Sequence, residues 1–312
     1  MTLRPLDLAA HSSDIDVALA VMLAHEREFC EVPDCTYATV LRQLTGPYAL
    51  QADHRIVKQG DSPVGVVILE SDAARRDVYI DVYVVPGTDP AVTAELVRHG
   101  VQCARRVVAG RDGQWRIDSG CILDDLQLSA ALRDAGFVRQ RIYWRMTRVL
   151  ESVSPTMPAA PAGVTLDVAR TEADLDALYE TYCASFSGHF GYTHRTRDQY
   201  VDAITNGEGP TPERWWLARL DGTPVALCIQ DDSRAEFGTA WVRTLGVVPE
   251  ARGRGIARWL LQSCFADAAA RGMSDIGLTV DSDNDTGATR LYESVGMRSY
   301  QSIALWSLPL ED

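Results

Sequence analysis

The residues with the clearest chemical potential lie in one stretch, L-G-V-V-P-E-A-R-G-R-G-I-A-R-W-L-L, at positions 245–261. An apolar strand runs into a proline turn, and R-G-R-G-I-A at 252–257 then opens a helix with an apolar face. Glycine lets a backbone approach a ligand closely and adopt conformations that other residues avoid. The first turn of a helix carries unpaired N–H groups and a partial positive charge. With Arg252 and Arg254 added, the pattern predicts a binding site for a pyrophosphate-like anion.

Two other phosphate-binding loops do not fit this stretch. A Walker A loop needs G-x-x-x-x-G-K-[ST], and the single lysine, Lys58, lies outside any such pattern. A dinucleotide-binding fold needs G-x-G-x-x-G directly after the first strand of its unit. Here the third glycine is missing and the strand is the fourth of its half. A tight turn with solvated arginines remains the alternative interpretation.

A second stretch, D-S-D-N-D-T-G-A-T-R-L-Y-E-S-V-G-M at 281–297, follows on the next strand and helix. The pair of stretches resembles the two motifs of the GNAT acetyltransferase superfamily. Arg252, Gly255 and Ala257 match [RQ]-x-x-G-x-[GA]. The pattern N-x-x-A-x-x-x-Y-E-x-x-G-[FM] is matched by Asn284, Ala288, Tyr292, Glu293, Gly296 and Met297. The resemblance is clear over residues 164–308, whereas residues 1–150 share only the order of elements.

This resemblance implies acetyl-CoA as co-substrate and no metal. It implies that the strand before the loop splays from its neighbour and pairs with the pantetheine arm through Leu245, Gly246, Val247 and Val248. The pyrophosphate would be held by the backbone of Arg252, Gly253, Arg254, Gly255, Ile256 and Ala257. Asn284 would contact the cofactor arm.

The implied reaction is direct attack of a primary amine on the thioester, with Tyr292 as the proton donor to the leaving thiolate. A core tyrosine on an amphipathic helix is the alternative interpretation of Tyr292. Many relatives carry a glutamate base on the strand before the loop, but T-A-W-V-R-T-L-G-V at 239–247 has no carboxylate. The candidate bases are Glu236, Asp231, Asp232, His189 and Asp281.

The family places the segment S-G-H-F-G-Y-T-H-R, residues 187–195, over the thioester. His189, Phe190 and Tyr192 are therefore candidate substrate contacts, because aromatic faces in acidic surroundings suit a cation. Loop packing is the alternative explanation for each of them.

Alternating strand and helix patterns fill both halves of the chain. The stretch E-S-V-S-P-T-M-P-A-A-P-A-G predicts a linker at 151–163, between domains at 1–150 and 164–312. In the second half we expect strands at 164–169, 215–220, 225–230, 239–247, 276–280 and 298–306, and helices at 171–185, 197–206, 255–271 and 286–294. The expected fold is α/β: two GNAT-like domains, each with a mixed, mostly antiparallel sheet flanked by helices and a splayed strand pair.

The first half lacks the features of the phosphate loop. When Pro86 is aligned with Pro249, Asp89 falls opposite Arg252 and Pro90 opposite the following glycine. An aspartate repels pyrophosphate, and proline has no N–H to donate. We therefore expect 1–150 to be a degenerate domain and 164–312 the catalytic one; a CoA retained in the first half is the alternative.

The net charge is −13, with −3 in residues 1–150 and −10 in residues 151–312. Such acidity disfavours nucleic acid as a partner, and no run of about 18–20 apolar residues predicts a membrane span. Seven cysteines without metal-ligand spacing suggest a cytoplasmic location. We expect a monomer or homodimer that acetylates a small-molecule amine. A protein lysine or N-terminal acetyltransferase and a non-catalytic acyl-CoA sensor are the alternatives.

Overall fold

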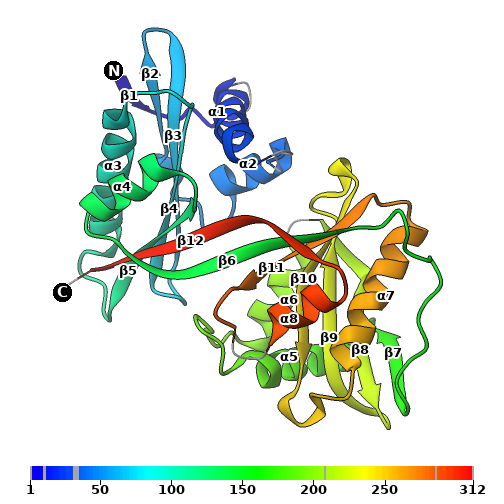
Figure 1. The fold of residues 1–312 in the computed structure, drawn as a ribbon. Coiled ribbons are helices and arrows are strands. Elements are labelled where there is room, and N and C mark those ends of the chain that lie inside the picture. Colours follow the sequence, from blue (N-terminus) through cyan, green and yellow to red (C-terminus); the bar gives the residue numbers. More distant parts are fainter. Residues whose placement is uncertain (1, 10–11, 31–34, 207–208, 285–286, 311–312) are drawn as a thin grey trace. The chain divides into compact units, whose positions relative to one another are not determined.

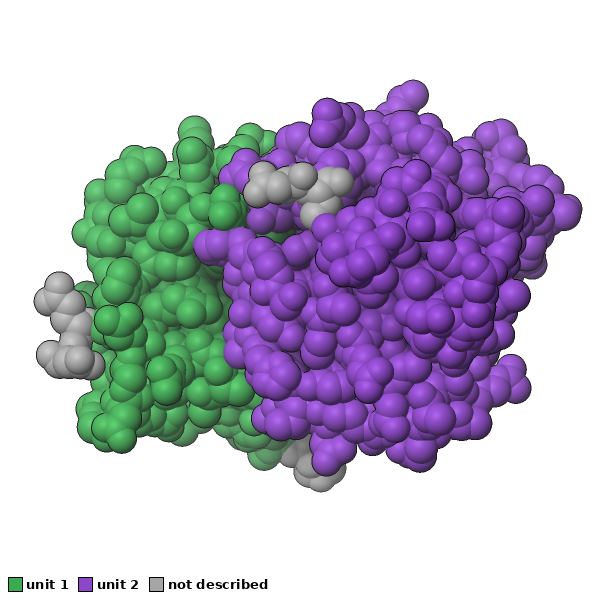
Figure 2. Space-filling view, turned by 90° about the horizontal axis from the view of Figure 1, so that it is seen from below, with its two compact units in different colours: residues 1–143, 301–312 green, residues 144–300 purple. Residues whose placement is uncertain are grey.

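The computed structural model describes residues 2–9, 12–30, 35–206, 209–284 and 287–310 (Figure 1). The chain divides into two compact units, coloured green and purple in Figure 2. Unit 1 comprises residues 1–143 and 301–312, and unit 2 comprises residues 144–300. In each unit, helices cover both faces of a mixed sheet, which confirms the expected fold class.

The sheet of unit 1 has the strand order β1-β2-β3-β4-β5-β12. These strands are β1 (Thr2–Pro5), β2 (Arg55–Gln59), β3 (Ser62–Asp72), β4 (Asp77–Val84), β5 (Trp115–Ile122) and β12 (Arg298–Leu310). One face is covered by α1 (Asp14–Phe29) and α2 (Tyr37–Thr45), and the other by α3 (Pro90–Val108) and α4 (Leu126–Asp134). Val66 and Ile68 on β3 pack on the first face and Val67 on the second, because side chains alternate along a strand.

The sheet of unit 2 has the order β6-β11-β10-β9-β8-β7. These strands are β6 (Val138–Val149), β7 (Val164–Val168), β8 (Pro210–Leu220), β9 (Thr223–Asp231), β10 (Thr239–Val247) and β11 (Asp275–Asp281). The helices are α5 (Glu172–Phe186), α6 (Arg197–Thr205), α7 (Ile256–Ala270) and α8 (Ala288–Ser294). Leu227 and Ile229 on β9 pack in the cluster beneath α5 and α6, whereas Ala226 and Cys228 pack in the cluster beneath α7 and α8.

Local sequence signals explain where several elements of unit 2 begin. The side chain of Thr171 accepts from the amide of Asp174, and the Asp174 carboxylate accepts from the Thr171 amide, so α5 starts with a capping box. The hairpin between β8 and β9 turns at Asp221 and Gly222, both with positive φ, as the D-G signal predicts. The predicted start of the last helix, Thr286, lies outside the described residues.

Each unit contains a strand from the other half of the sequence. In unit 1, β12 pairs antiparallel with β5, from Ile303 opposite Ile122 to Leu310 opposite Trp115. In unit 2, β6 is the neighbour of β11, and its Met146 lies in the α7-side core. The compact units therefore differ from the predicted division into 1–150 and 164–312, because the closing strand of each half completes the other sheet.

The predicted linker at 151–163 contains no helix or strand. It is anchored along unit 2, since the indole Nε1 of Trp259 on α7 donates to the carbonyl of Pro158 at 3.1 Å. Within the described part of the chain, no helix combines the length and apolar character that a membrane span requires. All seven cysteines are free thiols, and the described residues include no cluster of three or more potential metal ligands.

Candidate active site

A cavity of about 290 Å³ lies in unit 2. Its walls come from the ends of α5 and β10, the glycine turn, and the first turns of α7 and α8. The lining residues are Ser185, Phe186, His189, Leu245, Gly246, Val247, Ala251, Arg252, Gly253, Gly255, Ile256, Ala257, Arg258, Gly287, Ala288, Leu291 and Tyr292. The structure therefore brings most of the predicted cofactor-binding positions, His189 and Tyr292 to one site.

The strand β10 reaches this cavity with one edge unpaired. It runs parallel to β11 from Thr239 to Val242, and beyond that point no pairing between the two strands occurs among the described residues. A bulge between Val242 and Thr244 interrupts its pairing with β9. The equivalent pair in unit 1, β4 and β5, runs parallel only over residues 77–79 and 116–118. Both units thus contain the splayed strand pair expected from the sequence.

The backbone of Val247 faces the gap between the splayed strands. The amide of Val248 donates to Val225 O on β9 at 2.9 Å. Because successive residues in a strand point their N–H and C=O groups to opposite sides, those of Val247 point away from β9. The guanidinium of Arg252 reaches this edge: its Nε donates to Val247 O at 3.1 Å and its Nη2 donates to Ser185 O at 3.2 Å.

The turn between β10 and α7 requires its glycines. Gly253 and Gly255 have φ of +76° and +78°, in the left-handed region, where a residue with a side chain would be strained. Gly255 is the N-cap of α7 and provides no side-chain cap, so no side chain of its own competes for the first amides of the helix. Gly246 is needed for space instead, since a Cβ there would lie 2.7 Å from the ring of Phe186.

Tyr292 enters the cavity wall from α8 and is 8% exposed. Burial, with a smaller contribution from Cys228 on β9, raises the pKa of Tyr292 to about 12. The phenol is therefore protonated at neutral pH and has a proton to donate.

His189 lines the cavity from the loop after α5. Its amide donates to Phe186 O at 2.9 Å, its ring lies edge-on to the Phe186 ring at 4.9 Å, and its carbonyl accepts from Tyr192 N. The Nε2 atom is buried and has no hydrogen-bond partner among the described residues. Burial lowers the pKa of His189, Arg252 lowers it further, and Asp281 opposes both.

Several predicted residues do not line this cavity. Phe190 is 47% exposed, and Tyr192 packs against Tyr182 at a ring distance of 6.2 Å. Asn284 follows β11, and Arg254 is exposed in the turn. Val248 packs against the α7-side core.

Three candidate bases lie at the far end of β10. Glu236 is in η2 (Ala235–Phe237), just before the strand begins at Thr239. Strand β10 separates it from Val247, and the eight residue steps from Thr239 to Val247 span roughly 26 Å at about 3.3 Å per step. Asp231 pairs with Trp241 at that same end, and Asp232 is bonded to Arg214 there. Glu236, the first of the predicted bases, therefore does not reach the cavity.

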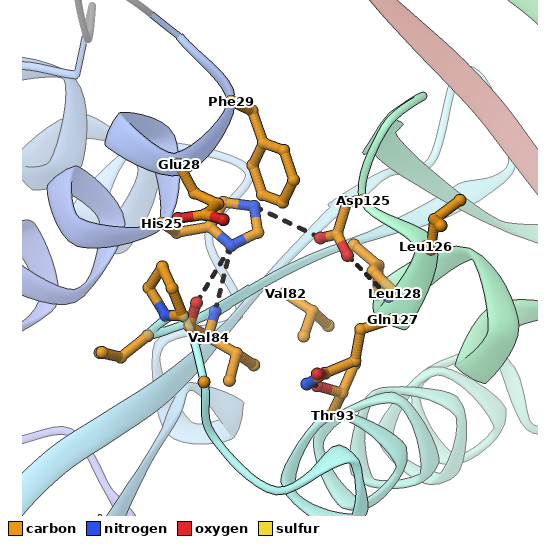
Figure 3. A pocket seen from close by; sticks show the side chains of 13 residues that line it. His25, Glu28, Phe29, Val82, Val84, Thr93, Asp125, Leu126, Gln127 and Leu128 are labelled. Atoms are coloured by element: carbon orange, nitrogen blue, oxygen red, sulfur yellow. Dashed lines mark hydrogen bonds and ion pairs between the residues drawn. The ribbon is translucent and has the colours of Figure 1, made fainter.

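Unit 1 contains a smaller cavity of about 170 Å³ at the equivalent place, where β4 ends and α3 and α4 begin (Figure 3). Val85 N donates to Val64 O, as Val248 N does to Val225 O, so Val84 corresponds to Val247. In Figure 3 the imidazole of His25 fills this position. Its Nδ1 lies 3.1 Å from Val84 O, and its Nε2 lies 3.6 Å from a carboxylate oxygen of Asp125.

The helix that follows this strand in unit 1 also differs from α7. Asp89 caps α3 by accepting from Ala91 N at 2.9 Å, and Pro90 occupies the first turn. One amide is therefore bonded by a carboxylate and another is missing. In unit 1 the helix start is therefore capped by the carboxylate of Asp89, whereas in unit 2 the start of α7 has no side-chain cap. This difference agrees with the sequence alignment of Asp89 with Arg252.

Comparison with known proteins agrees with this geometry. Residues 175–297 match the model of the acetyltransferase (GNAT) family. A mycothiol acetyltransferase from Thermobispora bispora is 32% identical over 181 residues, which cover 55% of this chain and 59% of that protein. One from Catenulispora acidiphila is 25% identical over 263 residues, covering 81% and 80%. The chain spans little more than half the length of several curated relatives that it matches.

Solved structures extend the likeness to the whole fold. A GCN5-related N-acetyltransferase from Sphaerobacter thermophilus superposes with a TM-score of 0.84 at 23% identity, covering 100% of this chain and 96% of that one. A tandem GNAT protein from the clavulanic acid biosynthesis pathway superposes with a TM-score of 0.71 at 16% identity over the full length of both.

Residues 175–297 therefore resemble the GNAT acetyltransferase family in sequence, and the whole chain has the fold of a tandem GNAT protein. Among such proteins the chain resembles mycothiol synthase in layout and the mycothiol acetyltransferases in sequence. The resemblance that the two motifs indicated is confirmed.

Proposed function

We propose that unit 2 transfers the acetyl group of acetyl-CoA to a primary amine of a small molecule. One observation carries this proposal: a single cavity joins the unpaired edge of β10, the uncapped start of α7 and the buried phenol of Tyr292. The family match and the relatives named mycothiol acetyltransferase support an acetyl transfer to a small acceptor.

The residues of the cavity fit acetyl-CoA, which supplies an activated acyl thioester when bound. The outward N–H and C=O of Val247 suit an amide-bearing arm, which must take the place of Arg252 at the Val247 carbonyl. Gly253 and Gly255 keep the turn open, and the first amides of α7 suit a pyrophosphate. Arg252 and Arg258 add positive charge to the lining.

In the proposed mechanism each protein group has one task. The cavity holds the acceptor amine next to the acyl carbon, which supplies much of the rate through proximity. The N–H of Val247 stabilises negative charge as it develops on the acyl oxygen. Tyr292 donates its proton to the sulfur that leaves.

A non-catalytic acyl-CoA sensor is the second candidate, and one observation favours it. The cavity lining, as far as the structure describes it, includes no aspartate or glutamate that could deprotonate an amine. The protein lysine or N-terminal acetyltransferase remains an outcome of the test.

The test combines calorimetry with acetyl-CoA and a panel of amines assayed by release of free thiol. Heat with acetyl-CoA and thiol release with a small amine are expected. Thiol release with peptides alone would favour a protein acetyltransferase, and heat without any thiol release would favour the sensor. Absence of heat would overturn the proposal.

A further inference from the structure

An amine acceptor must lose a proton before it can attack, because an alkylamine with a pKa of about 10 is mostly protonated at neutral pH. The cavity presents few groups that could accept this proton. Its titratable lining residues, among those that the structure describes, are His189, Arg252, Arg258 and Tyr292. Arginine does not deprotonate in proteins, and the phenol of Tyr292 is already protonated at neutral pH. The imidazole of His189 is left.

The geometry of His189 indicates a missing hydrogen-bond partner. Buried polar atoms in proteins are almost always hydrogen-bonded. His189 lines the cavity, and its Nε2 atom is buried and has no partner among the described residues. A ligand group that donates a hydrogen bond would satisfy it, and an ammonium group is such a donor.

The loop holds this ring in place. The amide of His189 donates to Phe186 O at the end of α5, and Tyr192 N donates to His189 O at 3.1 Å. The Phe186 ring meets the imidazole at an interplanar angle of 78°. Phe186 in turn packs against Gly246 of β10, so its ring contacts both the imidazole and the strand that carries the unpaired edge.

The surroundings of His189 keep its imidazole in the neutral form, which can accept a proton. Burial lowers its pKa, the cationic Arg252 beyond β10 lowers it further, and Asp281 at the end of β11 opposes both. The imidazole is therefore neutral at pH 7. Once protonated, it is repelled by Arg252, which also lines the cavity, and this repulsion favours release of the proton to water.

We propose that His189 is the general base of unit 2, taking a proton from the ammonium form of the acceptor at Nε2. This inference rests on the proposed function and assigns the base that the proposed mechanism lacks. The freed nitrogen lone pair forms the bond to the acyl carbon as the carbon–sulfur bond breaks. Tyr292 protonates the sulfur, and the proton left on the acylated nitrogen returns to Tyr292. The net products are an amide, a thiol and one proton that His189 passes to water.

The experiment compares His189→Gln with His194→Gln, an exposed histidine of the same loop. The probe is the alkylamine that gives the fastest thiol release with the wild type, assayed from pH 6 to pH 10. For His189→Gln we expect kcat/KM at pH 7 to fall by about 10²–10⁴-fold, the range of general base catalysis. The deficit should shrink toward pH 10, where about half of the amine is already deprotonated in solution and needs no base. Binding of acetyl-CoA and the activity of His194→Gln should match the wild type.

Each other outcome has a distinct meaning. A wild-type rate and pH profile in His189→Gln would overturn the role of His189 while leaving the proposed function intact. A deficit of the same size at every pH would also overturn it, because that result describes a structural role. A wild type that binds acetyl-CoA but releases no thiol with any amine would contradict the proposed function, and this inference with it.

Discussion

The Nδ1 atom of His25 lies 3.1 Å from the carbonyl oxygen of Val84. The imidazole therefore takes up the strand edge that, in unit 2, is bonded at Val247 O by the exposed guanidinium of Arg252. Since the helix start in unit 1 is also capped by Asp89, we expect calorimetry to give one acetyl-CoA per chain. Two molecules bound per chain would show that the first half retains a working cofactor groove.

The glycine turn offers a direct test of the anion site. In Gly255→Val the side chain has open space, but a φ of +78° strains any β-branched residue. We expect the turn to rearrange and acetyl-CoA binding to be lost by calorimetry. Gly87→Val is the matched control, because Gly87 has the same φ and the same open space in unit 1. Equal loss of binding in both variants, or retention in Gly255→Val, would contradict the assignment.

Removing the phenol of Tyr292 should separate catalysis from binding. We expect Tyr292→Phe to lower kcat by about 100-fold or more, because the sulfur loses its proton donor. The dissociation constant for acetyl-CoA should stay unchanged. Tyr200→Phe is the control: its hydroxyl is also buried, but Tyr200 belongs to α6, packs in the cluster beneath α5 and α6, and does not line the cavity. A Tyr292→Phe enzyme with normal kcat would leave Tyr292 as a packing residue.

His54 predicts a pH dependence of stability in unit 1. Burial lowers its pKa from the ordinary value of 6.5 to about 4. The unfolded chain therefore binds a proton that the folded chain refuses, and the free energy of unfolding should fall as the pH drops from 6.5 to 4. The loss is roughly 3 kcal/mol for 2.5 pH units.

Urea unfolding at pH 7 and pH 4.5 measures this effect. His54→Gln can still donate to Leu44 O and accept from Leu69 N, the two bonds that the imidazole makes, but it does not titrate. The variant should lose less stability between the two pH values than the wild type. If the variant and the wild type lose the same free energy of unfolding between pH 7 and pH 4.5, His54 contributes nothing to the acid sensitivity.

Because β12 belongs to unit 1, a substitution in this strand should destabilise elements that lie far away in the sequence. Trp306 packs in the core of unit 1 with residues of β3 and α3. Trp306→Ala should cost about 3–5 kcal/mol, as truncation of a buried aromatic does. Hydrogen exchange should then accelerate in β3 and β4 of unit 1 more than in β8 and β9 of unit 2. Acceleration of hydrogen exchange confined to unit 2 would contradict the assignment of β12 to unit 1.

Local signals in the sequence were sufficient for much of unit 2. The capping box at Thr171, the turn at Asp221 and Gly222, and the periodic apolar residues of α7 all act within a few residues. They predicted elements that the structure contains. Helices α1 and α2 were not predicted. In α1 the apolar residues at 17–24 form a continuous run without helical periodicity, and the helix lacks a side-chain cap.

The long-range features had no such local signal. The alternation of β12 indicates a strand but does not specify which sheet edge it joins. Nothing in the sequence around His25 predicts that its ring meets Val84, 59 residues away. Glu236 is close to β10 in sequence, but it precedes the end of the strand that lies away from the cavity. The two motifs succeeded because they encode the loop and Tyr292 together.

The exchange of closing strands has a consequence for synthesis on the ribosome. The edge of β5 is completed by residues 303–310 of β12, the last strand among the residues that the structure describes. A nascent chain that has already folded residues 55–122 must therefore carry an open sheet edge through the translation of some 180 further residues. Open edges invite pairing with other chains. Expression of the first half alone should yield aggregates that a co-expressed peptide of β12 relieves.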